Sequence, residues 1–142
     1  MVLLHEQHQR SFFAVWQKAK EAGLKLPETT DPDCNSLESL LHHVFGASRG
    51  EMMWMCEKLE LPDPGIQPVP PAAEISSTAE SYLEHLLERW RLPLANVREE
   101  QFFVPTYTSV WGVEYCIDAM LEHAVMHLVR HEFQIRELLE TQ

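Results

Sequence analysis

The chain has few basic residues, and this shortage excludes polyanionic partners. Eleven lysines and arginines stand against 22 aspartates and glutamates, so the formal net charge at pH 7 is -11 over 142 residues. Proteins bind nucleic acids largely by neutralising phosphates with Lys and Arg, and no basic cluster offsets the acidic balance. We therefore expect no nucleic-acid partner, and no anionic membrane surface as a partner either.

Long hydrophobic runs and paired cysteines are also missing. No apolar run approaches the roughly 20 residues of a membrane-spanning helix, and the first residues lack the pattern of a secretory signal. Cys34, Cys56 and Cys116 are odd in number and form no CxxC motif. These absences predict a protein of the reducing cytoplasm without a disulfide framework.

What remains is the composition of one globular domain, residues 1–142, with 45% hydrophobic and 23% charged residues. Apolar residues recur with helical periodicity in four segments, and this predicts helices over residues 3–22, 37–60, 79–91 and 115–140. Together they predict an all-α protein, a four-helix bundle.

Helix ends and connections follow from local signals. Gly23 suits the end of the first helix, and the capping-box spacings Asn35 to Glu38 and Ser77 to Glu80 suit the starts of the second and third. Five of the nine prolines lie in residues 61–73, which predicts a long, stiff loop between the second and third helices. The irregular segment before the last helix has room for a short strand at residues 101–104.

The most informative feature is three histidines at four-residue spacing, His123, His127 and His131. Residues four apart on a helix are neighbours, so two such imidazoles can bind one metal ion. His127 and His131 share the apolar face of their helix. A single histidine there is more often a hydrogen-bonded core residue than a ligand, but three in register favour a metal site.

A metal ion needs at least one more ligand from another part of the chain, because one helix cannot surround it. His43 lies at the edge of the apolar face of the second helix, whereas His42 lies about 100° further round and is expected at the surface. We therefore predict a site formed by His43, His127 and His131.

Other side chains remain open as additions to this site. Glu51 leans inward two turns after His43, either as a further ligand or supporting group or as one half of an ordinary helix salt bridge. Cys116 is better explained as a small buried residue than as a ligand, and His123 is undecided. His5, His8 and His85 are expected at the surface.

Three imidazoles leave coordination positions open, as in catalytic sites. Zinc and nickel suit such ligands best, and iron suits them too. The metal would activate either water or a thiol, in a pocket rimmed by Trp54, Glu51 and residues 107–111. No carboxylate base is evident, which favours a thiol.

Two segments resemble the DinB-like family, also called YfiT-like metal-dependent hydrolases. Residues 40–48, LLHHVFGAS, are similar to its LxHLxxA pattern, and residues 121–135, LEHAVMHLVRHEFQI, to its HxxxHxxxHRGQI pattern. The resemblance implies a four-helix bundle and a metal held by His43, His127 and His131. His123 is not a usual ligand, and Glu132 and Phe133 replace the Arg and Gly of the pattern. Members of the family include thiol S-transferases.

These observations favour an enzyme of the thiol S-transferase or hydrolase type, acting on a small-molecule substrate, with a low-molecular-weight thiol as a candidate. No catalytic residue is assigned beyond the metal ligands. The alternative is a non-catalytic metal-binding or stress-related interaction protein. We also expect a homodimer, because four aromatic residues cannot all face inward at their helical angles: Phe13, Trp16, Trp90 and Phe133.

Overall fold

The computed structural model describes all 142 residues and is mostly helical, which confirms the all-α prediction. The elements are α1 (Val2–Glu21), a 3-10 turn η1 (Pro32–Cys34), α2 (Leu37–Lys58), α3 (Ile75–Trp90), a short α4 (Glu99–Phe103), β1 (Tyr107–Thr108), β2 (Glu114–Tyr115) and α5 (Ile117–Thr141).

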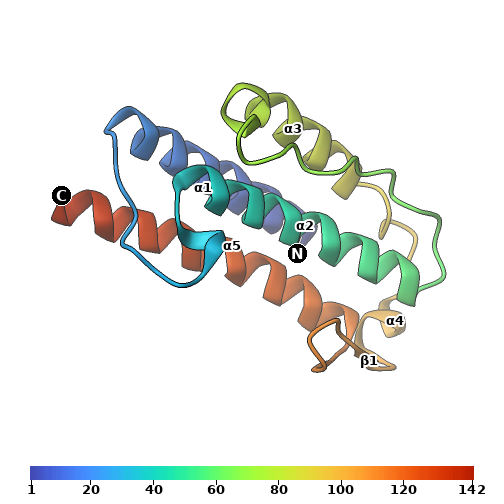
Figure 1. The fold of residues 1–142 in the computed structure, drawn as a ribbon. Helices are drawn as coiled ribbons and strands as arrows, with labels where there is room; N and C mark the ends of the chain where they lie inside the picture. The colour runs from blue at the N-terminus through green and yellow to red at the C-terminus, as the bar shows by residue number, and fades with distance from the viewer.

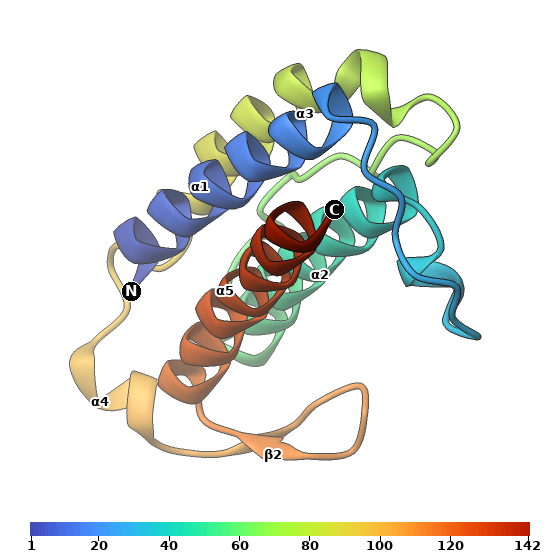
Figure 2. The ribbon, with the colours of Figure 1, turned by 90° about the vertical axis from the view of Figure 1, so that its left-hand side faces the viewer.

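The four long helices lie side by side around one core (Figures 1 and 2). Helix α5 packs against α1 and α2, and α2 also packs against α3. The inner face of α5 is buried as its periodicity predicts, with Ile117, Met120, Ala124, Leu128 and Ile135 almost inaccessible. This packing brings the middle of α2 beside the middle of α5. None of the helices has the length and apolar character needed to cross a membrane.

The predicted start of α2 at Leu37 is confirmed, but its predicted cap and the predicted start of α3 are wrong. The hydroxyl of Ser36, not the side chain of Asn35, caps α2 by accepting a hydrogen bond from the backbone of Ser39 at 3.0 Å. Helix α3 begins at Ile75, before the supposed capping box. The Ser77 hydroxyl instead donates to the carbonyl of Glu74 at 2.9 Å, so a serine inside the first turn imitates the spacing of a cap.

The proline-rich segment is a long loop, as expected, and it runs back along α2. Arg49 Nε donates to the carbonyl of Ile66 at 3.0 Å, and His42 Nδ1 lies 2.9 Å from the carbonyl oxygen of Pro70. The prediction that His42 is a solvated surface residue is therefore wrong, because this loop half-buries it and gives it a hydrogen-bond partner.

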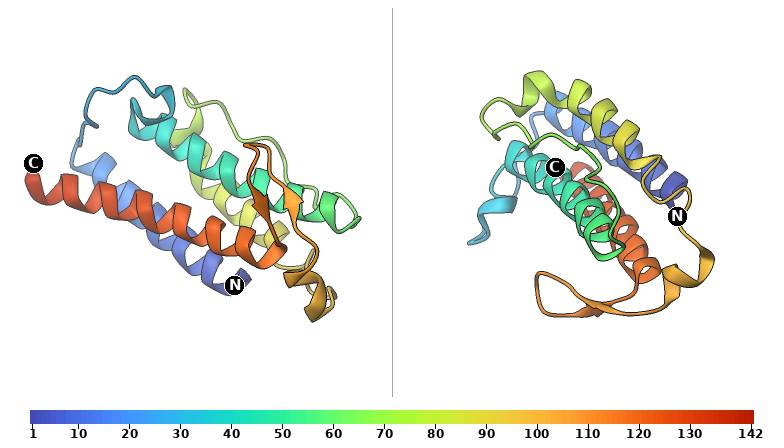
Figure 3. Two further views of the ribbon diagram at one scale, coloured as in Figure 1. Left: turned by 90° about the horizontal axis from the view of Figure 1, so that it is seen from below. Right: turned by 90° about the vertical axis from the view of Figure 1, so that its right-hand side faces the viewer.

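The predicted strand at residues 101–104 is also wrong. Most of that segment is the short helix α4, and the strands follow it, with Tyr107 opposite Tyr115 in an antiparallel pair. Gly112 in the turn has φ of +85°, a left-handed conformation that favours glycine. The hairpin lies beside the first turns of α5 (Figure 3), where it contributes to the site described below.

The expectation that four aromatic residues cannot all face inward is confirmed, but by Phe133 alone. Phe13, Trp16 and Trp90 are at most 6% exposed, and the indole of Trp90 donates to the carbonyl of Ser48 at 3.0 Å. Only Phe133, 61% exposed, faces outward. Three of the four residues that motivated a homodimer are thus core residues, and the homodimer itself stays a prediction.

Candidate metal centre

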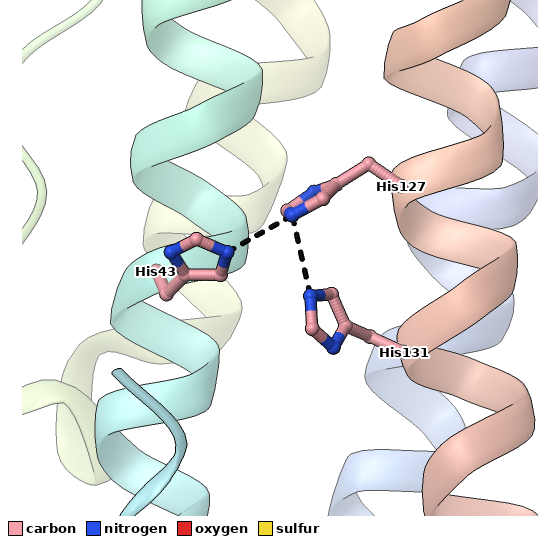
Figure 4. A group of neighbouring side chains, drawn as sticks. All are labelled: His43, His127 and His131. Carbon is pink, nitrogen blue, oxygen red and sulfur yellow. Dashed lines mark hydrogen bonds between the residues drawn. The ribbon is translucent and has the colours of Figure 1, made fainter. Parts of the chain in front are cut away.

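Three imidazole nitrogens meet between α2 and α5. His43 Nε2 lies 2.9 Å from His127 Nε2, and His131 Nε2 lies 3.2 Å from the same atom (Figure 4). His127 and His131 are one turn apart on α5 and both are buried, while His43 reaches across from α2 and is partly exposed. The three predicted ligands therefore converge, and they form one group able to hold a metal ion.

The outer nitrogens of two rings are held by oxygen atoms. Asp33 Oδ2 lies 3.2 Å from His43 Nδ1, and Gln134 Oε1 lies 3.1 Å from His131 Nδ1. An oxygen of this kind accepts a hydrogen bond, so each Nδ1 carries the proton and each Nε2 of a neutral ring presents its lone pair. Such partners are the usual means of orienting histidines that bind metals.

This arrangement leaves an electrostatic mismatch that a cation would remove. The lone pairs of His43 and His131 both point at His127 Nε2, which has at most one hydrogen to donate. One close nitrogen pair therefore has no proton between its atoms. A metal ion accepts all three lone pairs, so the donor set fits a metal better than it fits hydrogen bonds alone.

The separations of the nitrogen atoms fit a metal as well. Ligand nitrogens about 2.0–2.1 Å from an ion and about 90–110° apart are separated by about 2.9–3.4 Å. The two close separations, 2.9 Å and 3.2 Å, lie within that range. All three candidate ligand atoms lie within 4.8 Å of one another.

Burial keeps the two α5 imidazoles neutral. Desolvation, with smaller contributions from the neighbouring imidazoles of His131 and His43, lowers the pKa of His127 to about 3. Desolvation also lowers the pKa of His131, against a smaller opposite effect of its hydrogen bond to Gln134. Neutral imidazole is the form that binds metal, so no proton has to be displaced at neutral pH.

No role was assigned to Asp33 or to Gln134 from the sequence. Gln134 follows His131 by three residues on the same helix, a spacing at which side chains interact, so it could have been found. Asp33 lies in η1, outside any periodic segment. No sequence signal marks it, because its position depends on how the loop before α2 folds.

The three additional candidates do not join this group. The Cys116 thiol caps α5 by accepting a hydrogen bond from the backbone of Ala119 at 3.4 Å, and eleven residues separate it from His127, about 16 Å of helix. Glu51 Oε1 lies 3.8 Å from His123 Nε2, so these two side chains neighbour each other. The ring centroids of His123 and His127 are 6.3 Å apart.

Glu51 and His123 instead border a cavity that His43 and His127 also line. The cavity has a volume of about 530 Å³, and its other residues are mostly small or apolar: His43, Gly46, Ala47, Gly50, Trp54, Val110, Trp111, Met120 and His127. Trp54 Nε1 donates to the carbonyl of Thr108 at 3.3 Å, which ties the hairpin to α2. Trp54, Glu51 and the hairpin thus line a pocket, as expected from the sequence.

The remaining histidines lie apart from this centre. The expectation that His5 is a surface residue is wrong, because it is fully buried and stacks on Trp90 with ring centroids 3.6 Å apart. Its Nε2 lies 3.2 Å from the hydroxyl of Ser48. His8 and His85 are partly exposed, and His85 Nε2 accepts a hydrogen bond from the backbone of Gln67.

Comparison of the chain with family models, with curated proteins and with solved structures gave no match. The resemblance to the DinB-like family therefore stays a prediction from two sequence motifs, and the case for a metal centre depends on the geometry described above.

Proposed function

We propose that the protein is a metal-dependent enzyme that acts on a small molecule at a divalent transition metal held by His43, His127 and His131. Zinc and nickel are the metals that such a ligand set suits best, and iron is the next. The observation that supports this most strongly is the convergence of three Nε2 atoms beside a mostly apolar cavity that His43 and His127 line.

The ligand count and the cavity together favour catalysis over a structural metal. Structural zinc sites are usually closed by four protein ligands, whereas catalytic sites keep a position for substrate. No cysteine or carboxylate joins the three histidines. A cavity of about 530 Å³ is within the range of small-molecule sites, so a substrate has room beside the metal.

A bound metal of this kind lowers the pKa of a water molecule or a thiol that it binds. A hydrolase also commonly needs a general base near neutral pH, and Glu51 is the only carboxyl group on the cavity wall. Burial raises the pKa of Glu51 to about 8, so it is mostly protonated at neutral pH and serves poorly as a base. We therefore favour transfer of a low-molecular-weight thiol to a small electrophile, with hydrolysis second.

We further propose that the fold is a DinB-like bundle and that the protein is cytoplasmic. The packing of α1, α2, α3 and α5 is compatible with a DinB-like four-helix bundle, as the motifs imply. A thiol substrate and three free cysteines both suit the reducing cytoplasm.

The test is a screen of metal-loaded protein, purified without a nickel column, against several cellular thiols paired with a generic electrophile. Ester and amide substrates are screened beside it. We expect metal-dependent conjugation that is lost in His131→Ala and kept in His85→Ala, which removes a histidine remote from the centre. Absence of turnover in both screens would favour the non-catalytic metal-binding or interaction protein instead.

A further inference from the structure

Glu51 carries a buried carboxyl group that is almost without partners. The residue is 6% exposed, and its Oε2 atom makes no hydrogen bond. Its Oε1 atom has only His123 Nε2 nearby, at 3.8 Å, which is too long for a good hydrogen bond. A buried polar atom left in this state costs free energy, so its retention on a cavity wall needs an explanation.

The position of Glu51 in the cavity offers an explanation for its retention. The residue follows His43 by two turns of α2 and lines the same cavity as His43 and His127. Gly50, Trp54 and Met120 line the same cavity with apolar or small groups. The cavity therefore has two polar regions, the three-histidine group and the Glu51–His123 pair, with apolar walls between. A small molecule in this space would meet both.

The protonation state decides what Glu51 offers to such a molecule. Desolvation raises its pKa to about 8, and neither Lys nor Arg lines the cavity to oppose that effect. In the metal-free protein at neutral pH the group is mostly a carboxylic acid with an O–H to donate. Buried acids of this kind serve as general acids in other enzymes.

We propose that Glu51 is the proton donor of this site, and that the electrophile carries oxygen at its reacting carbon, as an epoxide does. This inference rests on the proposed thiol transfer. The sulfur–carbon bond forms as the ring carbon–oxygen bond breaks, and the ring oxygen takes the proton of Glu51. The proton released when the thiol ionises restores the carboxylic acid, so the net reaction adds the thiol across the ring.

The alternative for an unpartnered carboxyl group is a cationic ligand, which would require Glu51 to ionise among apolar neighbours. The proton-donor role needs no such ionisation before the substrate binds. The two roles also differ experimentally, because only a proton donor distinguishes between leaving groups.

The experiment compares two probes of similar size in the zinc-loaded protein, styrene oxide and benzyl chloride, with 2-mercaptoethanol as the thiol. The oxygen that leaves carbon in styrene oxide needs a proton, whereas chloride does not. In Glu51→Gln we expect kcat/KM for styrene oxide to fall about 100-fold or more and that for benzyl chloride to change less than about twofold. The control is Glu57→Gln, on the same helix but with a side chain 74% exposed.

A second measurement does not depend on turnover. The infrared spectrum at neutral pH should contain the carbonyl band of a protonated carboxylic acid, and this band should be missing in Glu51→Gln and present in Glu57→Gln. A wild-type spectrum without the band would overturn the role of Glu51, whatever the kinetics.

The kinetic outcomes separate the two proposals. Equal losses with both probes, or no loss with styrene oxide, would overturn the proton-donor role and leave thiol transfer standing. Failure of the wild-type protein to conjugate either probe in a zinc-dependent way would overturn thiol transfer, and the role of Glu51 with it.

Discussion

The Nδ1 atom of His43 lies 3.2 Å from the Oδ2 atom of Asp33, which precedes it by ten residues. Asp33 is positioned by η1, where its backbone N–H donates to the side chain of Asp31 at 3.0 Å. The carboxylate turns the imidazole so that Nε2 faces His127. A loop thus orients the one ligand that comes from α2.

Replacing Asp33 should weaken metal binding without unfolding the protein. In Asp33→Ala we expect the Kd for zinc to rise about 10- to 100-fold, because the ring of His43 loses its orienting partner. The side chain of Asp33 is 55% exposed, so the melting temperature of the metal-free protein should barely change. Competition with a chromogenic chelator measures the Kd.

Asp63→Ala is the matched control, because Asp63 is likewise an exposed aspartate outside the long helices; its carboxylate accepts a hydrogen bond from the backbone of Gly65. The Kd of Asp63→Ala for zinc should equal that of the wild type. An unchanged Kd in Asp33→Ala would mean that the contact with His43 plays no part in binding.

Gly46 offers a way to fill the cavity without touching a ligand. It borders the cavity, and a Cβ added there would meet nothing within 4 Å. Gly46→Leu should therefore reduce activity by about tenfold or more through substrate exclusion, since one added side chain takes up space that the substrate needs. The metal content should stay at the wild-type level, which elemental analysis checks.

Gly46→Ala is the companion variant, because it removes the glycine but leaves most of the space. A helix-interior glycine is less stable than alanine by about 0.5–1 kcal/mol, so this variant should be more stable than the wild type and still active. Full activity in Gly46→Leu would show that substrate binds elsewhere.

The helical fold was predictable because the apolar residues that indicate each helix recur many times along it. The apolar periodicity of α5, from Ile117 through Leu128 to Ile135, depends on many residues and tolerates a few exceptions. Boundaries depend on single residues, and Ser77 shows how a serine inside a helix can imitate a cap. The prediction of a strand at residues 101–104 was wrong for a similar reason, because apolar side chains in so short a segment suit a strand or a helical turn equally.

The convergence of the three histidines was predictable because spacing on one helix fixes the relation of His127 to His131, and the apolar face of α2 indicates where His43 must lie. The role of Asp33 was not predictable, because its contact with His43 depends on the path of an irregular loop. His5 was misplaced because its polarity suggested exposure, whereas stacking on Trp90 and contact with Ser48 compensate for its burial.

The pKa of Glu51 predicts a specific dependence of stability on pH. Burial raises it from 4.5 to about 8, so between these values the unfolded chain has lost a proton that the folded chain keeps. The free energy of unfolding therefore falls as pH rises through this range. Glu51→Gln cannot ionise and should lack this contribution.

Urea unfolding of both metal-free proteins at about pH 5 and about pH 9 measures this contribution. Between the two pH values, the free energy of unfolding of the wild type should fall relative to that of Glu51→Gln by on the order of a few kcal/mol. Other titrating groups, His5 included, are common to both proteins and cancel. Parallel pH profiles would indicate that Glu51 ionises normally in the folded state.

The predicted homodimer now has a more specific surface. Met126 and Phe133 are 56% and 61% exposed, and seven residues separate them, so both lie on the outer face of α5. We expect sedimentation at micromolar concentration to give a dimer for the wild type and a 16.5 kDa monomer for Phe133→Glu. A wild-type monomer would refute the dimer, and an unchanged dimer in the variant would refute this surface.

The most direct test of the metal centre is the metal content of three proteins purified without a nickel column and then equilibrated with zinc. The wild type and His42→Ala should each hold about one equivalent, because His42 neighbours His43 in the chain but contacts the proline-rich loop. His127→Ala should hold almost none, because it loses the nitrogen that both other ligands face. Equal metal content in His127→Ala and His42→Ala would contradict the assignment of the centre.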